Sequence, residues 1–174
     1  RGATTVFAAD HAAPFYLFLP MNAQAAVLPS FNLEELPRRP SFQRLAPADD
    51  APFVEATRMI AAAERVTLKA GNGARGVDPR LLDELLRRAD AAYVHGPSAV
   101  GVLPGSHPRN MGVGGSKGSI SGNAAMARAE LAIVVGARAV CQWDSSGTAW
   151  ASARSVIAIN ARPEDAAHYN RSLP

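Results

Sequence analysis

The stretch Val66–Gly76, VTLKAGNGARG, joins a short run rich in β-branched residues to glycines at positions 71, 73 and 76. This is the G-x-G-x-x-G spacing of a turn that lets the backbone approach the diphosphate of a dinucleotide. A standard site also needs a helix that begins inside the motif and an acidic residue about twenty positions later. Here the next helix is expected only at Asp78, and the following strand ends at His95 without a carboxylate. The spacing therefore favours a tight turn between a strand and a helix over an NAD site.

Further polar and glycine residues follow the other predicted strands. In a parallel sheet the carboxyl ends of the strands meet at one edge, where ligands bind. Arg138, after an apolar strand, is the best single candidate for contact with an anion, and a salt bridge is its alternative role. His95 is a candidate polar site residue, with a structural hydrogen-bonding role as the alternative. The full candidate set for binding a cofactor is Gly71, Asn72, Gly73, His95, Gly96, Gly136, Arg138 and Asn160.

Other reactive residue types lack the spacing that their chemistry needs. Cys141 has no cysteine or histidine partner at metal-ligand spacing, which predicts a buried small side chain. The serines of DSSG, 144–147, lack a G-x-S-x-G nucleophile elbow. Lys117 in GGSKGS resembles a phosphate-binding loop, but its glycine spacing is wrong and no strand is predicted directly before it. His107 is expected to shape a loop. No catalytic residue and no metal site is predicted.

Composition bounds the class of protein. The chain has 174 residues, 48% of them hydrophobic and 19% charged, which is typical of a globular protein with one core. The net charge of +3 comes from scattered basic residues, so neither nucleic acid nor a membrane is an expected partner. No signal peptide or membrane-spanning run is visible, and the single Cys141 fits a reducing cytoplasm.

The hydrophobic pattern predicts alternating strands and helices. Strands are expected at 14–20, 65–70, 91–94, 131–135 and 155–160. Helices are expected from 51, from 79, at 119–128 and from 162, while 101–118 and 139–150 are expected to be irregular. This order predicts an α/β fold, a three-layer Rossmann-like parallel sheet flanked by helices.

The expected helices carry start signals and apolar stripes. Asp49-Asp50-Ala51-Pro52 and Asp78-Pro79 each place an N-cap aspartate before a proline in the first turn. Apolar positions at helical spacing then predict the buried faces. These positions are Phe53, Val54, Ala56, Met59, Ile60 and Ala63 in the first helix, and Leu81, Leu82, Leu85 and Leu86 in the second.

Proline density divides the chain. Residues 28–50 contain repeated prolines, which block helices and central strands, and are expected to form a linker. Residues 1–27 would then hold the last strand of a preceding domain, and 51–174 a central α/β domain. Because the chain begins at Arg1 without methionine, we expect it to be a piece of a longer polypeptide.

Four stretches in this order resemble thiamine-diphosphate-dependent enzymes. FYLFLPMNAQ is similar to the last strand of their pyrimidine-binding domain, and FVEATRMIAAAERVTLKAGNGA to the entry of their central domain. HPRNMGVGGSKGSISGNAAMARAELAIVVGAR and SVIAINARPEDAAHYN resemble later parts of that central domain. Within the superfamily, the sequence is most similar to acetolactate synthases and trihydroxycyclohexanedione hydrolases.

The resemblance implies a structural role for this chain. In such enzymes the other domains supply the activating glutamate and the G-D-G…N motif that holds thiamine diphosphate through Mg²⁺; this sequence contains no G-D-G. The chain alone is therefore expected to be inactive. Its expected partners are other domains of its parent, which would be a homo-oligomer.

The resemblance also raises a cofactor alternative. Some relatives bind FAD in the central domain, and Gly71, Gly73, Gly136 and Arg138 match their groove, while Asn160-Ala161 replaces an acidic pair. Binding of FAD or ADP, by this domain or by a stand-alone nucleotide-binding module of the same fold, thus stays open. A sirtuin-like deacylase is a third hypothesis, and the single cysteine argues against its zinc-bearing form.

Overall fold

The computed structural model describes residues 16–27, 30, 32, 34, 49–138 and 149–161. The chain divides into two units, Arg1–Ala46 and Pro47–Pro174, and the sheet lies in the second. The predicted linker lies almost entirely outside the described residues, and the helix expected from 162 lies wholly outside them. No helix in the described part of the chain is long and apolar enough to cross a membrane.

The described part of the first unit contains only one short helix, α2 (Met21–Gln24). The prediction of a buried strand at 14–20 was wrong for residues 16–20, which form neither helix nor strand. Their side chains are exposed, including Phe18 at 86%. An apolar run becomes a strand only when a neighbour satisfies its backbone groups, and among the described residues no strand pairs with this one.

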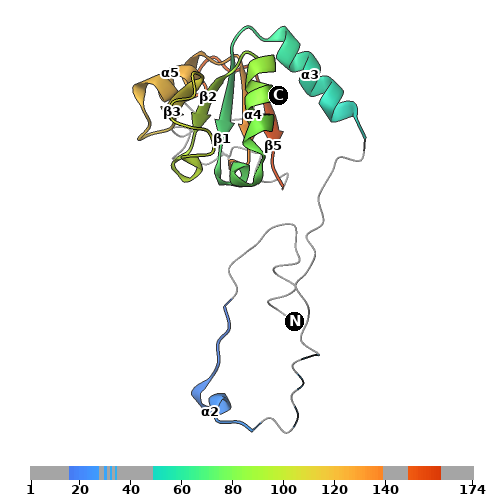
Figure 1. The fold of residues 1–174 in the computed structure, drawn as a ribbon, viewed down its shortest axis with the longest axis vertical. Helices are drawn as coiled ribbons and strands as arrows, with labels where there is room; N and C mark the ends of the chain where they lie inside the picture. Colours follow the sequence, from blue (N-terminus) through green and yellow to red (C-terminus); the bar gives the residue numbers. More distant parts are fainter. Residues whose placement is uncertain are drawn as a thin grey trace. The chain divides into compact units, whose positions relative to one another are not determined.

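The second unit is built around a five-stranded, all-parallel sheet (Figure 1). The predicted α/β class, a parallel sheet flanked by helices, is confirmed. The strand order is β3-β2-β1-β4-β5, so the chain starts in the middle, moves to one edge and returns to the other side of β1. The strands are β1 (Val66–Ala70), β2 (Ala92–His95), β3 (Asn110–Val113), β4 (Leu131–Val135) and β5 (Ser155–Ile159).

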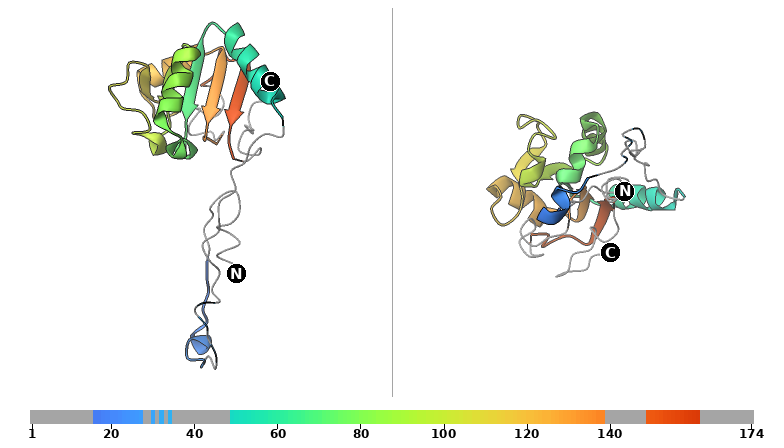
Figure 2. Two further views of the ribbon diagram at one scale, coloured as in Figure 1. Left: turned by 45° about the vertical axis from the view of Figure 1, so that its right-hand side comes forward. Right: turned by 90° about the horizontal axis from the view of Figure 1, so that it is seen from below.

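Helices cover both faces of the sheet (Figure 2). The α4 helix (Pro79–Arg88) and the end of α3 (Ala51–Ala62) pack on one face, against the larger apolar cluster. The α5 helix (Ile120–Arg128) packs on the other face, where Met126 joins Val94, Ala132 and Trp150. The short 3₁₀ helices η2 (Asn72–Gly76) and η3 (Pro97–Ala99) follow β1 and β2.

The helix starts agree with their predicted positions, with one change of capping group. The Asp78 carboxylate accepts a hydrogen bond from the Arg80 N–H at 2.9 Å, as expected of an N-cap. Asp50 makes no such bond; instead, the Asp49 carboxylate accepts one from the Ala51 N–H at 3.0 Å.

The two predicted apolar stripes are only partly buried. In α4, Leu82 and Leu86 are buried, whereas Leu81 is 65% exposed. No residue of α3 is fully buried, and its stripe reaches the core only through Met59 and Ile60 near its end. A stripe of adjacent positions is wider than the strip of a helix that one sheet covers.

Burial along the strands follows their position in the sheet. β1 is buried at every residue and β4 at all but Val134, as predicted for a continuous apolar run with helices on both faces. β5 is an edge strand and is only half buried. The prediction that 101–118 is wholly irregular was wrong, because Asn110–Val113 pairs with β2 as the other edge strand, β3.

One buried polar atom in the sheet has no partner. The Tyr93 hydroxyl of β2 is buried without a hydrogen-bond partner among the described residues. Burial raises the pKa of Tyr93 to about 12, because water no longer stabilises the phenolate.

Candidate functional site

The turn after β1 packs directly against the turn after β4. The Gly71 N–H donates to the Val135 carbonyl and the Gly73 N–H to the Gly136 carbonyl, both at 2.9 Å. A Cβ on Gly71 would overlap the Cα of Ala137. The first two glycines of the motif therefore let two stretches of the protein's own backbone meet, at the place where a dinucleotide motif brings backbone against diphosphate.

The β4 side of this contact is shaped by Gly136. Its φ of +57° lies in the left-handed region, and a Cβ there would stand 2.5 Å from the Ala74 nitrogen. The Asn160 amide donates to the Ala137 carbonyl at 3.2 Å and so joins the end of β5 to the same turn. The third glycine of the motif, Gly76, has open space around its Cβ position. The helix α4 begins only after it, at Pro79.

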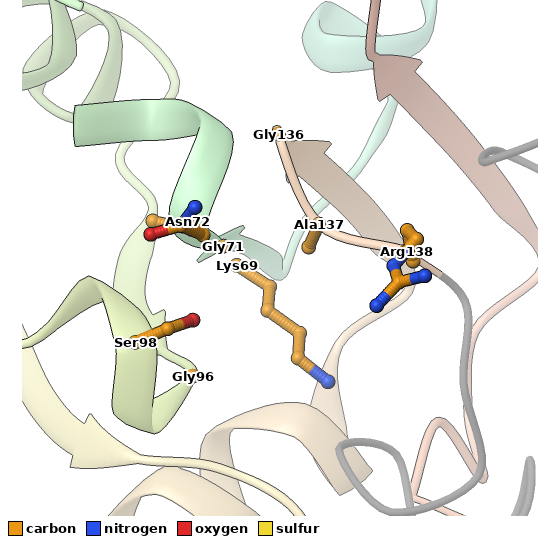
Figure 3. A pocket seen from close by; sticks show the side chains of 9 residues that line it. Lys69, Gly71, Asn72, Gly96, Ser98, Gly136, Ala137 and Arg138 are labelled. Atoms are coloured by element: carbon orange, nitrogen blue, oxygen red, sulfur yellow. The ribbon is translucent and has the colours of Figure 1, made fainter. Parts of the chain in front are cut away.

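A pocket of about 110 Å³ opens beside these turns, at the carboxyl ends of β1, β2 and β4 (Figure 3). It lies where the strand order reverses, which is the usual ligand position in open α/β sheets. The volume is enough for several water molecules, since one needs about 10–15 Å³. The lining residues are Lys69, Ala70, Gly71, Asn72, Gly96, Ser98, Gly136, Ala137 and Arg138.

Five of the eight predicted site residues line this pocket, namely Gly71, Asn72, Gly96, Gly136 and Arg138. Gly73, His95 and Asn160 stand outside the lining. Gly73 and Asn160 bond to the turn after β4. His95 is 7% exposed; its Nδ1 lies 3.2 Å from the Gly96 carbonyl oxygen, and its ring is 5.7 Å from the Tyr93 ring.

Sequence reasoning missed Lys69 and Ser98. Lys69 is only 4% exposed, and its ammonium nitrogen lies 5.9 Å from the centre of a Trp150 ring. Figure 3 shows the Lys69 side chain and the Arg138 guanidinium in the same region of the pocket. The available signal was a charged residue inside an otherwise apolar strand, because lysine is almost never fully buried without compensation.

The charge of the lining is one-sided. Lys69 and Arg138 are the charged side chains among the nine lining residues, and none of the nine is acidic. Arg138 is exposed, and no hydrogen bond or ion pair joins its guanidinium to another residue within the described ranges, so the alternative role as a salt bridge gains no support there. The pocket thus favours negatively charged groups.

The second glycine-rich stretch, 112–118, has a strand directly before it. β3 ends at Val113, so the prediction that no strand precedes this loop was wrong. The loop's backbone bonds are internal, however: the Asn123 side chain both accepts from the Gly115 N–H at 2.8 Å and donates to its carbonyl at 3.0 Å. A Cβ on Gly118 would lie 2.5 Å from the Val113 oxygen.

The other candidate residues have structural settings or lie outside the described residues. His107 holds its loop as predicted: Nε2 lies 3.0 Å from an Asp83 carboxylate oxygen, and Nδ1 accepts from the Arg109 N–H at 3.2 Å. Hydrogen bonds from His107 and Arg87 hold the pKa of Asp83 below its usual value. Cys141 and the DSSG segment lie outside the described residues. Within those residues no group of three acidic, histidine or cysteine side chains could hold a metal ion.

Comparison with known proteins gives concordant matches. Residues 54–173 match the family model described as "Thiamine pyrophosphate enzyme, central domain". The large subunit of acetolactate synthase isozyme 1 from Escherichia coli is 33% identical over 126 residues, 72% of this chain and 22% of that protein. Acetolactate synthase from Mycobacterium bovis is 36% identical over 85 residues, 48% of this chain and 14% of that protein. The chain thus spans less than a quarter of the relatives it matches.

Proposed function

The chain belongs to the family of thiamine-diphosphate-enzyme central domains, and from this premise we propose that it serves as the structural and subunit-contact domain of a multidomain enzyme. The parent enzyme would be acetolactate-synthase-like and would join or cleave a carbon–carbon bond next to a carbonyl. A cyclic dione hydrolase is the second version of the parent. The observation that carries the proposal is the family match over 54–173.

The chemistry of the described residues supports a supporting role. Thiamine diphosphate is held through Mg²⁺, which prefers carboxylate, carbonyl and water oxygens. The pocket lining contains no carboxylate, and no acidic cluster for a metal occurs in the described ranges. These residues do not fit the Mg²⁺-bound diphosphate. We therefore propose that thiamine diphosphate and Mg²⁺ bind to other domains of a homo-oligomeric cytoplasmic parent.

A binding experiment tests this division of labour. The 174-residue chain is titrated calorimetrically with thiamine diphosphate and Mg²⁺ and is assayed for acetolactate formation from pyruvate. The Escherichia coli isozyme 1 large subunit serves as the positive control. We expect neither binding nor turnover from this chain alone. Stoichiometric binding of thiamine diphosphate would contradict the proposal.

The alternative proposal assigns FAD or ADP to the pocket at the strand ends. Its support is the position of the pocket at the reversal of strand order, together with Gly71, Gly136 and Arg138 in the lining. Two features count against it: Gly73 is closed off by the Gly136 backbone, and the Asn160 amide is committed to the Ala137 carbonyl. Titration with FAD and ADP separates the proposals, since a ligand of the folded state must also raise the melting temperature.

A further inference from the structure

Lys69 gives the pocket a property that neither the family nor the glycine motif assigns. Along β1, Leu68 and Ala70 face the larger apolar cluster, so Lys69 projects from the opposite face, toward Trp150. This places an ammonium group on the buried wall of the pocket. An ammonium in such a place attracts an anion more strongly than a surface lysine does, because water screens the charge less.

Arg138 supplies a second cation from a different element. It follows β4, whereas Lys69 belongs to β1, and Figure 3 shows both side chains in the pocket region. The Ser98 hydroxyl and the Asn72 amide add neutral hydrogen-bonding groups to the lining. Two cations with hydroxyl and amide groups, and no carboxylate, suit an oxyanion of high charge density.

The space limits what the oxyanion belongs to. The pocket measures about 110 Å³, and drug-sized ligands occupy sites of roughly 300–1,000 Å³. The Gly136–Ala137 backbone fills the space beside Gly71 and Gly73 that a longer ligand would need. A single phosphate- or carboxylate-sized group fits the size and the charge of this pocket.

We propose that this pocket binds one oxyanion, a phosphoryl or carboxylate group, between the Lys69 ammonium and the Arg138 guanidinium. The site discriminates by size against the diphosphate of a dinucleotide. This inference goes beyond the scaffold function and does not depend on it, because the anion takes no part in thiamine chemistry here.

The test is a calorimetric titration of the 174-residue chain with inorganic phosphate, acetate and ADP, each against potassium chloride of equal ionic strength. Amide NMR signals of Gly71, Gly96 and Gly136 report whether binding occurs in the pocket. We expect saturable binding of phosphate or acetate, with whichever binds identifying the chemical source. Lys69→Met should weaken it at least tenfold, while Lys117→Met, at an exposed lysine of the other glycine-rich loop, should leave it unchanged.

Three outcomes would overturn the proposal. One is that neither anion binds better than chloride, and another is that Lys69→Met binds as the wild type does. The third is ADP binding tenfold tighter than phosphate, which would favour the nucleotide alternative. If Lys69→Met does not fold, Arg138→Gln decides alone, since that exposed side chain makes no contact the fold needs. The thiamine titration uses a different ligand, so the two proposals fail independently.

Discussion

Two glycine-rich turns follow parallel strands in this domain, and they differ in what fills the space beside them. After β1, glycines 71 and 73 meet the backbone of the turn after β4, and a cation-lined pocket remains next to the contact. After β3, the loop 114–118 folds on itself and is closed by Asn123. Each segment is superficially similar to a phosphate-binding motif. The difference teaches that glycine spacing reports close backbone approach, while the neighbouring charges report what binds.

The largest effect is expected where backbone meets backbone. Gly71→Ala should destabilise the domain by about 3 kcal/mol, because the added Cβ overlaps Ala137 and neither backbone can yield cheaply. The matched control is Gly76→Ala in the same motif, which has open space and should change stability by less than about 0.5 kcal/mol. Urea unfolding of both variants measures the difference, and equal losses would refute the packing role of the first glycine.

The second loop should depend on its side-chain clasp instead. Asn123→Ala removes both bonds to Gly115 and leaves a buried backbone N–H and carbonyl without those partners, which should cost about 2 kcal/mol. Asn123→Asp keeps the acceptor but faces the Gly115 carbonyl with a carboxylate, so it should restore stability only in part. Amide hydrogen exchange at Gly115 checks the local effect. Protection as in the wild type would show that the clasp is dispensable.

The helix start that follows this loop should contribute less. The Ser119 hydroxyl accepts from the Gly122 N–H at 3.0 Å as the N-cap of α5. Ser119→Ala should lose about 1 kcal/mol, whereas Ser119→Asp, which can still accept this bond, should retain most of the stability. Thermal unfolding ranks the two. A larger loss for the aspartate would indicate that the hydroxyl's donation to the Met111 carbonyl matters more than the cap.

The smallest effect is expected at an exposed clamp on the first turn. Arg75 donates to the Ser98 carbonyl at 2.6 Å and to the Val100 carbonyl at 3.1 Å, and so ties η2 to η3. Arg75→Ala should lose about 0.5–1 kcal/mol, because solvent competes for bonds at an exposed guanidinium. Arg75→Lys cannot make both bonds with the same planar geometry and should behave similarly. Full retention of stability by the lysine variant would contradict this.

The sequence predicted elements where one local signal was strong. The apolar run of β4 and the Asp78-Pro79 start of α4 needed no information from elsewhere in the chain. β3 was missed because NMGV is four residues long, contains glycine and is defined by its pairing with β2, whose register is irregular.

The candidate site was predictable by topology and less so by contact. Parallel strand ends meet at one edge, so five of the eight candidates line the pocket. What closes the space beside Gly71 is Ala137, far along the chain, and no local pattern contains that approach. Lys69 was missed because a lysine in a strand is ordinarily expected to reach solvent, and only the assembled sheet buries it.

The pairing of β1 with β4 has a consequence for the order of folding. β1 pairs first along the chain with β2 through α4, but its partner on the other side arrives only after β3 and α5 have been made. Contacts between distant segments form slowly, because the intervening chain must first be closed into a loop. Arg138 follows the late strand, so we expect a half-folded chain to present Lys69 without its companion. Anion binding would then report the arrival of β4, and a stopped-flow refolding experiment in phosphate would time that event.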